Sequence, residues 1–193
     1  MNKAKQISSK IVIPIRWTKP FVGWHKLNTN GASLGNLGKV GGEGIIRDSQ
    51  GNWVKGFSRS IRYTTSVMFE LWALRDGLNL AIQLGIHQFD VELHAKVIVD
   101  LLNGVDSPNR AYSPLLYDCR SLLARLTQAR VVYTFREVNK CANFLAKRGC
   151  SIREDFVIFD VSPSVELDQL LDLDINGLYY YRLVAVAVAS VAN

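Results

Sequence analysis

Residues 24–60 read WHKLNTNGASLGNLGKVGGEGIIRDSQGNWVKGFSRS and consist of short apolar segments separated by turn-forming residues. The Gly- and Asn-rich residues 33–40 predict a loop, and Asp48–Gly51 predicts a tight turn whose glycine accepts a positive φ. Around these breaks we predict three strands, which form an antiparallel meander, at residues 24–29, 41–47 and 53–60.

The hydrophobic period changes after this meander. Apolar residues between positions 67 and 82 recur at helical spacing, which predicts a helix with Ser66 as its N-cap and an end near Gly85. A strand, two helices, a strand and a closing helix are then predicted at residues 89–93, 96–103, 114–127, 131–135 and 139–148. The order βββ-α-β-α-α-β-α predicts an α/β fold in which helices flank a mixed five-stranded sheet.

The chain divides into three parts by composition. Residues 1–22 form a basic N-terminal arm, residues 23–150 form the folded domain, and residues 151–193 form an acidic and then apolar C-terminal tail. Within the tail we expect an extended piece at 156–161 and a short helix at 163–173. We predict that this tail is only partly ordered and loosely docked.

The net charge of +6 is unevenly distributed. Residues 1–153 carry 22 Lys and Arg against 10 Asp and Glu, whereas residues 154–193 carry one Arg against seven acidic residues. A body with this excess of positive charge attracts polyanions, and nucleic acid is the leading candidate partner. A basic protein with an acidic tail and no such partner is the alternative interpretation.

Cysteine usage and hydropathy indicate the cellular setting. Cys119, Cys141 and Cys150 are odd in number and form no CxxC or Cys/His cluster, which favours an intracellular reducing compartment, the nucleus or the cytoplasm. The sequence contains no run of about 18 apolar residues, so no membrane-spanning helix is predicted. Residues 1–20 lack the apolar core of a signal peptide but leave a transit peptide open. A monomer is the default oligomeric state.

Five sequence blocks carry a resemblance to a known family. They are KLNTNGA at 26–32, GIIRDSQG at 44–51, FELWAL at 69–74, VELH at 91–94 and REVNKCANFLA at 136–146. Their order and spacing resemble the plant ribonuclease H-like family, which is similar to the ribonuclease H domains of non-LTR retroelements. The resemblance covers about residues 17–150 and extends more weakly over 172–183. It implies a ribonuclease H-like fold and a retrotransposon-derived plant origin.

The resemblance also implies a chemistry. Active members hydrolyse the RNA strand of an RNA–DNA hybrid with two Mg²⁺ ions, which are held by Asp, Glu, Asp and Asp. The four motif positions fall on Asn30, Glu70, His94 and Asn143, so only Glu70 is retained. The position that often holds a family His before the Arg–Glu pair is Tyr133.

This ligand set predicts weak metal binding. Glu70 alone supplies a negative charge, Asn keeps one neutral carbonyl oxygen, and His94 suits transition metals better than Mg²⁺. Glu70 and His94 are too few ligands for a stable site. The neighbouring acids Glu92, Asp48 and Glu137 do not replace the lost carboxylates. We therefore expect no cofactor, although active relatives use Mg²⁺.

Three functions follow as alternatives. The first is a catalytically dead domain that still binds nucleic acid, with Arg136, Asn139 and Gly31 as candidate contacts. The second is an active RNA–DNA hybrid ribonuclease, and the third is a retroelement-derived interaction domain without catalysis. Structural explanations stay open for single residues: a strand-end Asn30, a Glu70 that interacts with the helix dipole, a surface His94, an ion pair of Arg136 with Glu137, and core positions for Trp53 and Trp72.

Overall fold

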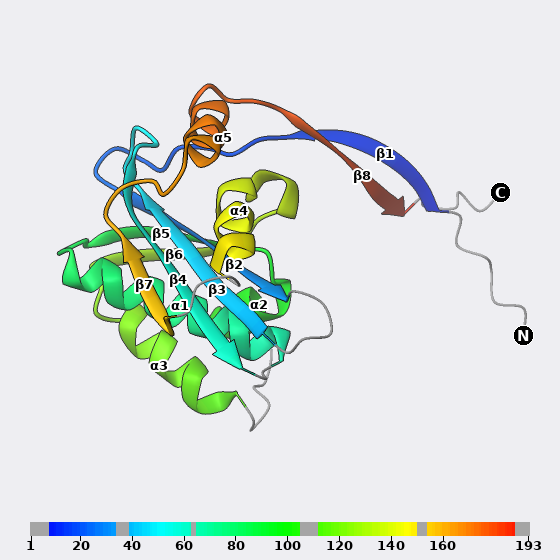
Figure 1. The fold of residues 1–193 in the computed structure, drawn as a ribbon. Coiled ribbons are helices and arrows are strands. Elements are labelled where there is room, and N and C mark those ends of the chain that lie inside the picture. Colours follow the sequence, from blue (N-terminus) through cyan, green and yellow to red (C-terminus); the bar gives the residue numbers. More distant parts are fainter. Residues whose placement is uncertain (1–7, 34–38, 63–64, 105–111, 150–153, 188–193) are drawn as a thin grey trace, which may run out of the picture.

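The computed structural model describes residues 8–33, 39–62, 65–104, 112–149 and 154–187. Its centre is a six-stranded mixed sheet with the strand order β6-β5-β2-β3-β4-β7 (Figure 1). The strands are β2 (His25–Ser33), β3 (Lys39–Arg47), β4 (Trp53–Arg62), β5 (Gln88–Leu93), β6 (Gln128–Tyr133) and β7 (Phe156–Phe159). β2, β3, β4 and β7 pair antiparallel, whereas β5 and β6 run parallel to β2.

Helices cover both faces of this sheet (Figure 1). α1 (Ser66–Gln83) packs on β2, β3 and α3 (Ser113–Leu123), and α2 (Lys96–Leu102) lies beside β5 and β6. On the opposite face, α4 (Lys140–Gly149) follows the short 3-10 helix η2 (Arg136–Val138) and packs on β2, β3 and α5 (Val165–Ile175). Neighbouring residues of β3 point to opposite faces of the sheet. Ile46 therefore belongs to the core under α1, and Ile45 belongs to the core under α4.

The predicted element order is confirmed from β2 to α4. Several boundaries differ. Thr65 rather than Ser66 caps α1, α3 ends at residue 123 rather than 127, β6 spans 128–133 rather than 131–135, and α4 begins after Asn139. β2 extends to residue 33 and β3 begins at residue 39, so both ends of the predicted 33–40 loop belong to strands. The turn after β3 is as predicted, with Gly51 at φ 92°. None of the helices in the described part of the chain is long and apolar enough to cross a membrane.

The predicted loosely docked tail is wrong for residues 156–175. β7 adds a sixth strand to the edge of the sheet, beside β4. α5 buries Leu167 and Leu171 against α4, because its apolar residues recur on the face turned towards the core. Three of the four acids of α5, Glu166, Asp168 and Asp172, are exposed, which explains why composition alone suggested a free tail.

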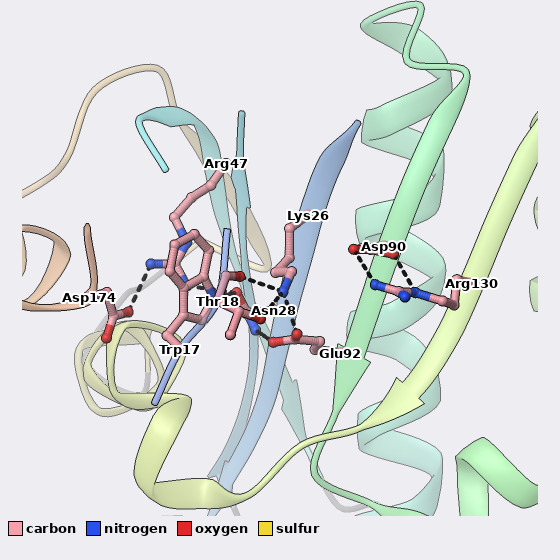
Figure 2. A network of polar contacts seen from close by, with 9 residues as sticks. All are labelled: Trp17, Thr18, Lys26, Asn28, Arg47, Asp90, Glu92, Arg130 and Asp174. Atoms are coloured by element: carbon pink, nitrogen blue, oxygen red, sulfur yellow. Dashed lines mark hydrogen bonds and ion pairs between the residues drawn. The ribbon is translucent and has the colours of Figure 1, made fainter. Parts of the chain in front are cut away.

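A buried polar network joins α5 to the sheet (Figure 2). Arg47 Nη1 donates to Asp174 Oδ2 at 2.8 Å, and Arg47 Nη2 donates to Asn28 Oδ1 at 2.7 Å. Trp17 is buried under the Arg47 guanidinium, 3.6 Å from ring centroid to Cζ, and its Nε1 also donates to Asn28. Trp17 therefore packs as part of the folded domain, and the predicted boundary of the N-terminal arm at residue 22 is wrong at this residue.

The two ends of the chain pair in a separate ribbon. β1 (Ser8–Ile15) and β8 (Tyr180–Ala187) are antiparallel neighbours in a two-stranded sheet. Figure 1 shows this ribbon leaving the domain beyond α5 and extending away from the main sheet. The basic N-terminal arm thus contains a strand, and the partner of this strand is the apolar end of the tail.

Candidate functional site

The four family positions meet at one end of the central strands. Asn30 lies near the end of β2, His94 directly follows β5, Glu70 lies in the first half of α1, and Asn143 lies near the start of α4. β2 and β5 are parallel neighbours, so their carboxyl ends reach the same edge of the sheet. Ligand sites of open α/β sheets lie at such an edge.

Glu70 is the centre of the direct contacts. The backbone N–H of Gly31 donates to Glu70 Oε1 at 3.0 Å, and His94 Nε2 lies 3.3 Å from the same oxygen. A Cβ on Gly31 would meet Phe69 Cδ1 at 2.4 Å, so glycine is required for this close approach of β2 to α1. The predicted candidate Gly31 thus holds Glu70 in place through its backbone.

Burial sets the charge of this pair. It raises the pKa of Glu70 to about 7, and the Gly31 hydrogen bond and the Arg136 charge only partly oppose the rise. Burial also lowers the pKa of His94, and Arg136 lowers it further. His94 is therefore largely neutral at pH 7, so its 3.3 Å contact with Glu70 is not an ion pair.

The segment from η2 into α4 supplies the other face of the site. Asn143 Nδ2 donates to the Arg136 backbone carbonyl at 3.1 Å, while the Arg136 side chain is exposed. Asn139 is buried, and its Nδ2 donates to Thr29 O at 2.7 Å. Asn139 thus fastens α4 to β2, whereas Arg136 remains available at the surface. Their predicted contacts with nucleic acid remain predictions.

Buried polar atoms without a protein partner gather at this edge. Within the described ranges they include Oδ1 and Nδ2 of Asn30, Oε2 of Glu70, Nδ1 of His94, and Oδ1 of Asn139 and Asn143. Buried polar groups in native proteins are almost always paired with protein, water or a ligand. This concentration marks the edge as a place built to meet water or a ligand, and not as ordinary core.

Sequence reasoning missed one carboxyl group close to the site. Glu43 of β3 lies opposite Asn30 in the β2–β3 register and is fully buried. Burial raises its pKa to about 9, the Ser58 hydrogen bond partly opposes this, and the nearby Glu70 adds to it. The signal was the hairpin register, because residues opposite each other in a strand pair share one face.

The donor set does not fit two Mg²⁺ ions. Of the four family positions, only Glu70 offers a carboxylate, and Glu43 is protonated at neutral pH. Among the described residues, no group of three or more His, Cys, Asp and Glu is arranged to hold a metal ion. Mg²⁺ prefers several hard anionic oxygen ligands, which these amides and this imidazole do not supply.

The acids considered as replacements have other partners. Glu92 accepts hydrogen bonds from Lys26 Nζ at 2.5 Å and Asn28 Nδ2 at 2.8 Å, within the network of Figure 2. Asp48 accepts from the backbone of its own turn, and Glu137 pairs with Arg182. The interpretation of Arg136 and Glu137 as an ion pair is therefore wrong, because Glu137 pairs with Arg182 instead.

Both tryptophans singled out in the sequence pack against apolar cores. Trp72 lies against the core under α1, and the Arg59 and Arg75 guanidinium groups lie over its ring. Trp53 packs against the core under α4. Their interpretation as core residues, rather than as platforms for bases, agrees with these positions.

The chain has relatives in sequence and in fold. The model of the reverse transcriptase-like family matches residues 28–149. An Arabidopsis thaliana protein named "Putative ribonuclease H protein" is 35% identical over 163 residues, which are 84% of this chain and 26% of that protein. The chain thus spans about a quarter of the length of this relative.

Solved ribonuclease H structures share the fold. The N-terminal ribonuclease H domain of a Mycobacterium tuberculosis protein has a TM-score of 0.62 and 20% identity, and covers 66% of this chain and 93% of that one. Ribonuclease H1 of the archaeon Halobacterium salinarum has a TM-score of 0.62 and 22% identity, with 66% and 97% covered. LC11 ribonuclease H1, solved with an RNA/DNA hybrid, has a TM-score of 0.60 and 22% identity, with 65% and 96% covered.

These likenesses cover the body that carries the site. The family match begins at Asn28 in β2 and ends in α4, so it includes all four site positions. The solved structures share the mixed sheet and its flanking helices, which confirms the predicted fold class. The chain therefore belongs to the reverse transcriptase-like family of ribonuclease H-like domains.

Proposed function

We propose that this chain is a nucleic-acid-binding domain that takes an RNA–DNA hybrid and has lost, or largely lost, two-metal hydrolysis of the RNA strand. The observation that carries the proposal is the set Asn30, Glu70, His94 and Asn143, held at one sheet edge with a single carboxyl group. The edge keeps the position of a family active site while its charge is nearly gone.

The charge distribution allows nucleic-acid binding to persist after the loss of metal-dependent hydrolysis. Phosphate contacts require Lys, Arg and backbone donors, and residues 1–153 carry an excess of twelve positive charges. Arg136 is exposed beside Glu70 and His94, where a phosphate of a bound strand would find a cation. Replacement of three acids by neutral groups also removes repulsion between the edge and phosphates. The LC11 relative was solved with a hybrid, which supports this choice of nucleic acid.

A hybrid-cleavage assay in Mg²⁺ or Mn²⁺, run beside a binding assay on the same labelled hybrid, tests the proposal. We expect salt-sensitive binding with little or no cleavage. Metal-dependent cleavage that disappears in Glu70→Gln would contradict the catalytic part. Lack of any binding at low salt would instead leave the interaction-domain alternative.

Restoration of the acids gives a sharper test. The triple variant Asn30→Asp, His94→Asp and Asn143→Asp recreates four carboxyl groups with Glu70. We expect Mg²⁺-dependent cleavage to appear, since the strands and helices that position these residues are in place. The same variant carrying Glu70→Gln is the matched control and should stay inactive. A restored protein that binds hybrid but cleaves none of it would show that the groove has decayed beyond its ligands.

The setting of the protein is part of the proposal. We propose an intracellular reducing compartment, the nucleus or cytoplasm, and a monomer. Cys119 and Cys141 support it, because both are free and buried, and burial raises the pKa of each thiol to about 12. A retrotransposon-derived plant origin is likewise a proposal, supported by the Arabidopsis relative.

A further inference from the structure

A basic pocket lies where the β1–β8 ribbon joins the domain. The pocket has a volume of about 210 Å³ and is lined by residues of the segment after β1, of the end of α5 and of the turn that follows α5, including Arg16, Lys19 and Gly177. Arg16 and Lys19 are both exposed. These residues lie outside the segment 28–149 that matches the family model, so the known site does not account for them.

Exposed tyrosines continue from this pocket along β8. The Arg16 guanidinium lies over the Tyr179 ring at 4.9 Å, and Tyr179 is half exposed. Tyr181 of β8 is 74% exposed and is two residues from Tyr179, which directly precedes the strand. Its cross-strand partner is Pro14, which is also exposed. The Tyr181 ring is therefore open to solvent, two residues along the chain from the ring that lies under Arg16.

The electrostatics of this surface favour an anion. Neither residues 8–20 nor residues 175–187 contain an acidic residue. Asp174 is the acid in the pocket wall, and its side chain is buried and paired with Arg47 at 2.8 Å. The positive charge of Arg16 and Lys19 is therefore not cancelled within the pocket.

We propose that this ribbon base, formed by Arg16, Lys19, Tyr179 and Tyr181, binds single-stranded nucleic acid. Arg16 and Lys19 contact a phosphate at the pocket, and an unpaired base stacks on Tyr181. Single-strand binding proteins combine these two features, a cationic track and exposed aromatic rings. The inference extends the proposed function: the body binds the hybrid and the ribbon base binds an unpaired strand that leaves it.

Fluorescence anisotropy with three labelled ligands tests this division. The ligands are a blunt hybrid, the same hybrid with an unpaired overhang, and an oligo(dT) or oligo(U) strand alone. The variants are Tyr181→Ala and the pair Arg16→Gln with Lys19→Gln. The matched controls are Tyr117→Ala, at a residue on α3 that is 73% exposed, and Arg125→Gln, at an exposed arginine outside the ribbon base.

We expect Tyr181→Ala to weaken binding of the free strand and of the overhang by at least about five-fold, with the blunt hybrid unchanged. The double charge variant should also reduce the slope of log affinity against log salt by roughly 0.7 for the free strand, since the one phosphate that both side chains contact contributes about 0.7. The control variants should bind like the parent protein. Thermal melting monitored by circular dichroism establishes that each variant is folded.

Equal single-strand affinity in the parent and both ribbon variants would overturn the inference. It would also be overturned if the protein bound phosphatidylserine vesicles but no single strand, or if the same substitutions abolished only a concentration-dependent self-association. Failure of blunt-hybrid binding with intact strand binding would reject the proposed function and keep the ribbon base. Binding of the blunt hybrid without any effect of the overhang would reject the ribbon-base inference and keep the proposed function.

Discussion

At the residue scale, the site combines strong burial with few charges. Glu43 and Glu70 lie on neighbouring elements near the carboxyl end of β2, and burial raises the pKa of both. The negative charge of Glu70 adds to the rise in the pKa of Glu43, as Coulomb repulsion predicts for two carboxyl groups in one site. Near pH 7, Glu43 is therefore protonated, whereas Glu70 is close to the midpoint of its titration.

Glu43→Gln should stabilise the protein at neutral and alkaline pH. A carboxyl group with a folded pKa of about 9 holds its proton above the unfolded value of 4.5, so its contribution to stability falls as pH rises from 4.5 towards 9. Gln cannot ionise, and we expect a gain on the order of 2–3 kcal/mol at pH 7 that vanishes near pH 4. Urea unfolding at pH 4, 7 and 9 measures it.

The control is Glu154→Gln, at an exposed acid on the surface. It should leave the pH dependence of unfolding unchanged. If Glu43→Gln and the parent lose stability in parallel between pH 5 and pH 9, the buried carboxyl group is not the source of that slope.

The family positions were predictable from sequence, and the details of the site were not. Asn30, His94 and Asn143 were placed by the residues on either side of them, which fix the local alignment. The position of Glu43 beside Asn30 depends on the β2–β3 register. The burial of Asn139 depends on its hydrogen bond to the carbonyl of Thr29, which is 110 residues away in the chain. Such long-range pairings leave no local pattern in a single sequence.

At the element scale, α5 is the clearest departure from the expected tail. Its N-cap Ser164 accepts from the Leu167 backbone, and the helix then directs Leu167, Leu171 and Asp174 inwards. Asp174 forms a buried ion pair with Arg47, whose side chain is 1% exposed. The sequence predicted a short helix here. It gave no sign that one of its many acids pairs with a buried arginine at the far end of β3.

Asp174→Ala should be among the most destabilising single changes in the chain. It leaves the Arg47 guanidinium buried without its carboxylate, a defect that costs roughly 3–5 kcal/mol in other proteins. Asp172→Ala is the matched control, since Asp172 is exposed on the same helix, and should change stability by less than about 0.5 kcal/mol. Chemical denaturation of both variants decides the comparison. Similar losses for the two aspartates would show that the ion pair does not anchor α5.

A double replacement without charges distinguishes the effect of the unpaired buried charge on stability from the effect of lost packing. The double variant Arg47→Met with Asp174→Leu removes both charges and keeps similar volumes. We expect it to recover much of the stability lost in Asp174→Ala, because no unpaired charge remains buried. If the double variant is as unstable as the single one, the packing or the hydrogen bond to Asn28, and not the unpaired charge, is what matters.

At the scale of the whole molecule, a packed body carries a thin projecting ribbon. The body has two apolar cores on opposite faces of one sheet. The ribbon has two strands, and its outer residues Val12, Tyr181 and Leu183 are each more than half exposed. Near its base, Arg182 pairs with Glu137 and lies over the Phe135 ring at 4.5 Å. The rest of the ribbon therefore depends on its own cross-strand bonds.

Hydrogen exchange should reveal this division in the intact protein. An isolated two-stranded ribbon is marginally stable in water, so the β1–β8 amides should exchange with an opening free energy within about 2 kcal/mol of zero. The β2–β3 amides lie in the centre of the sheet and should exchange only through global unfolding. Addition of an oligo(dT) strand should slow exchange in β8 near Tyr181 and leave β2 unchanged. Ribbon amides as protected as those of β2, without any ligand, would mean that ribbon and body unfold as one cooperative unit.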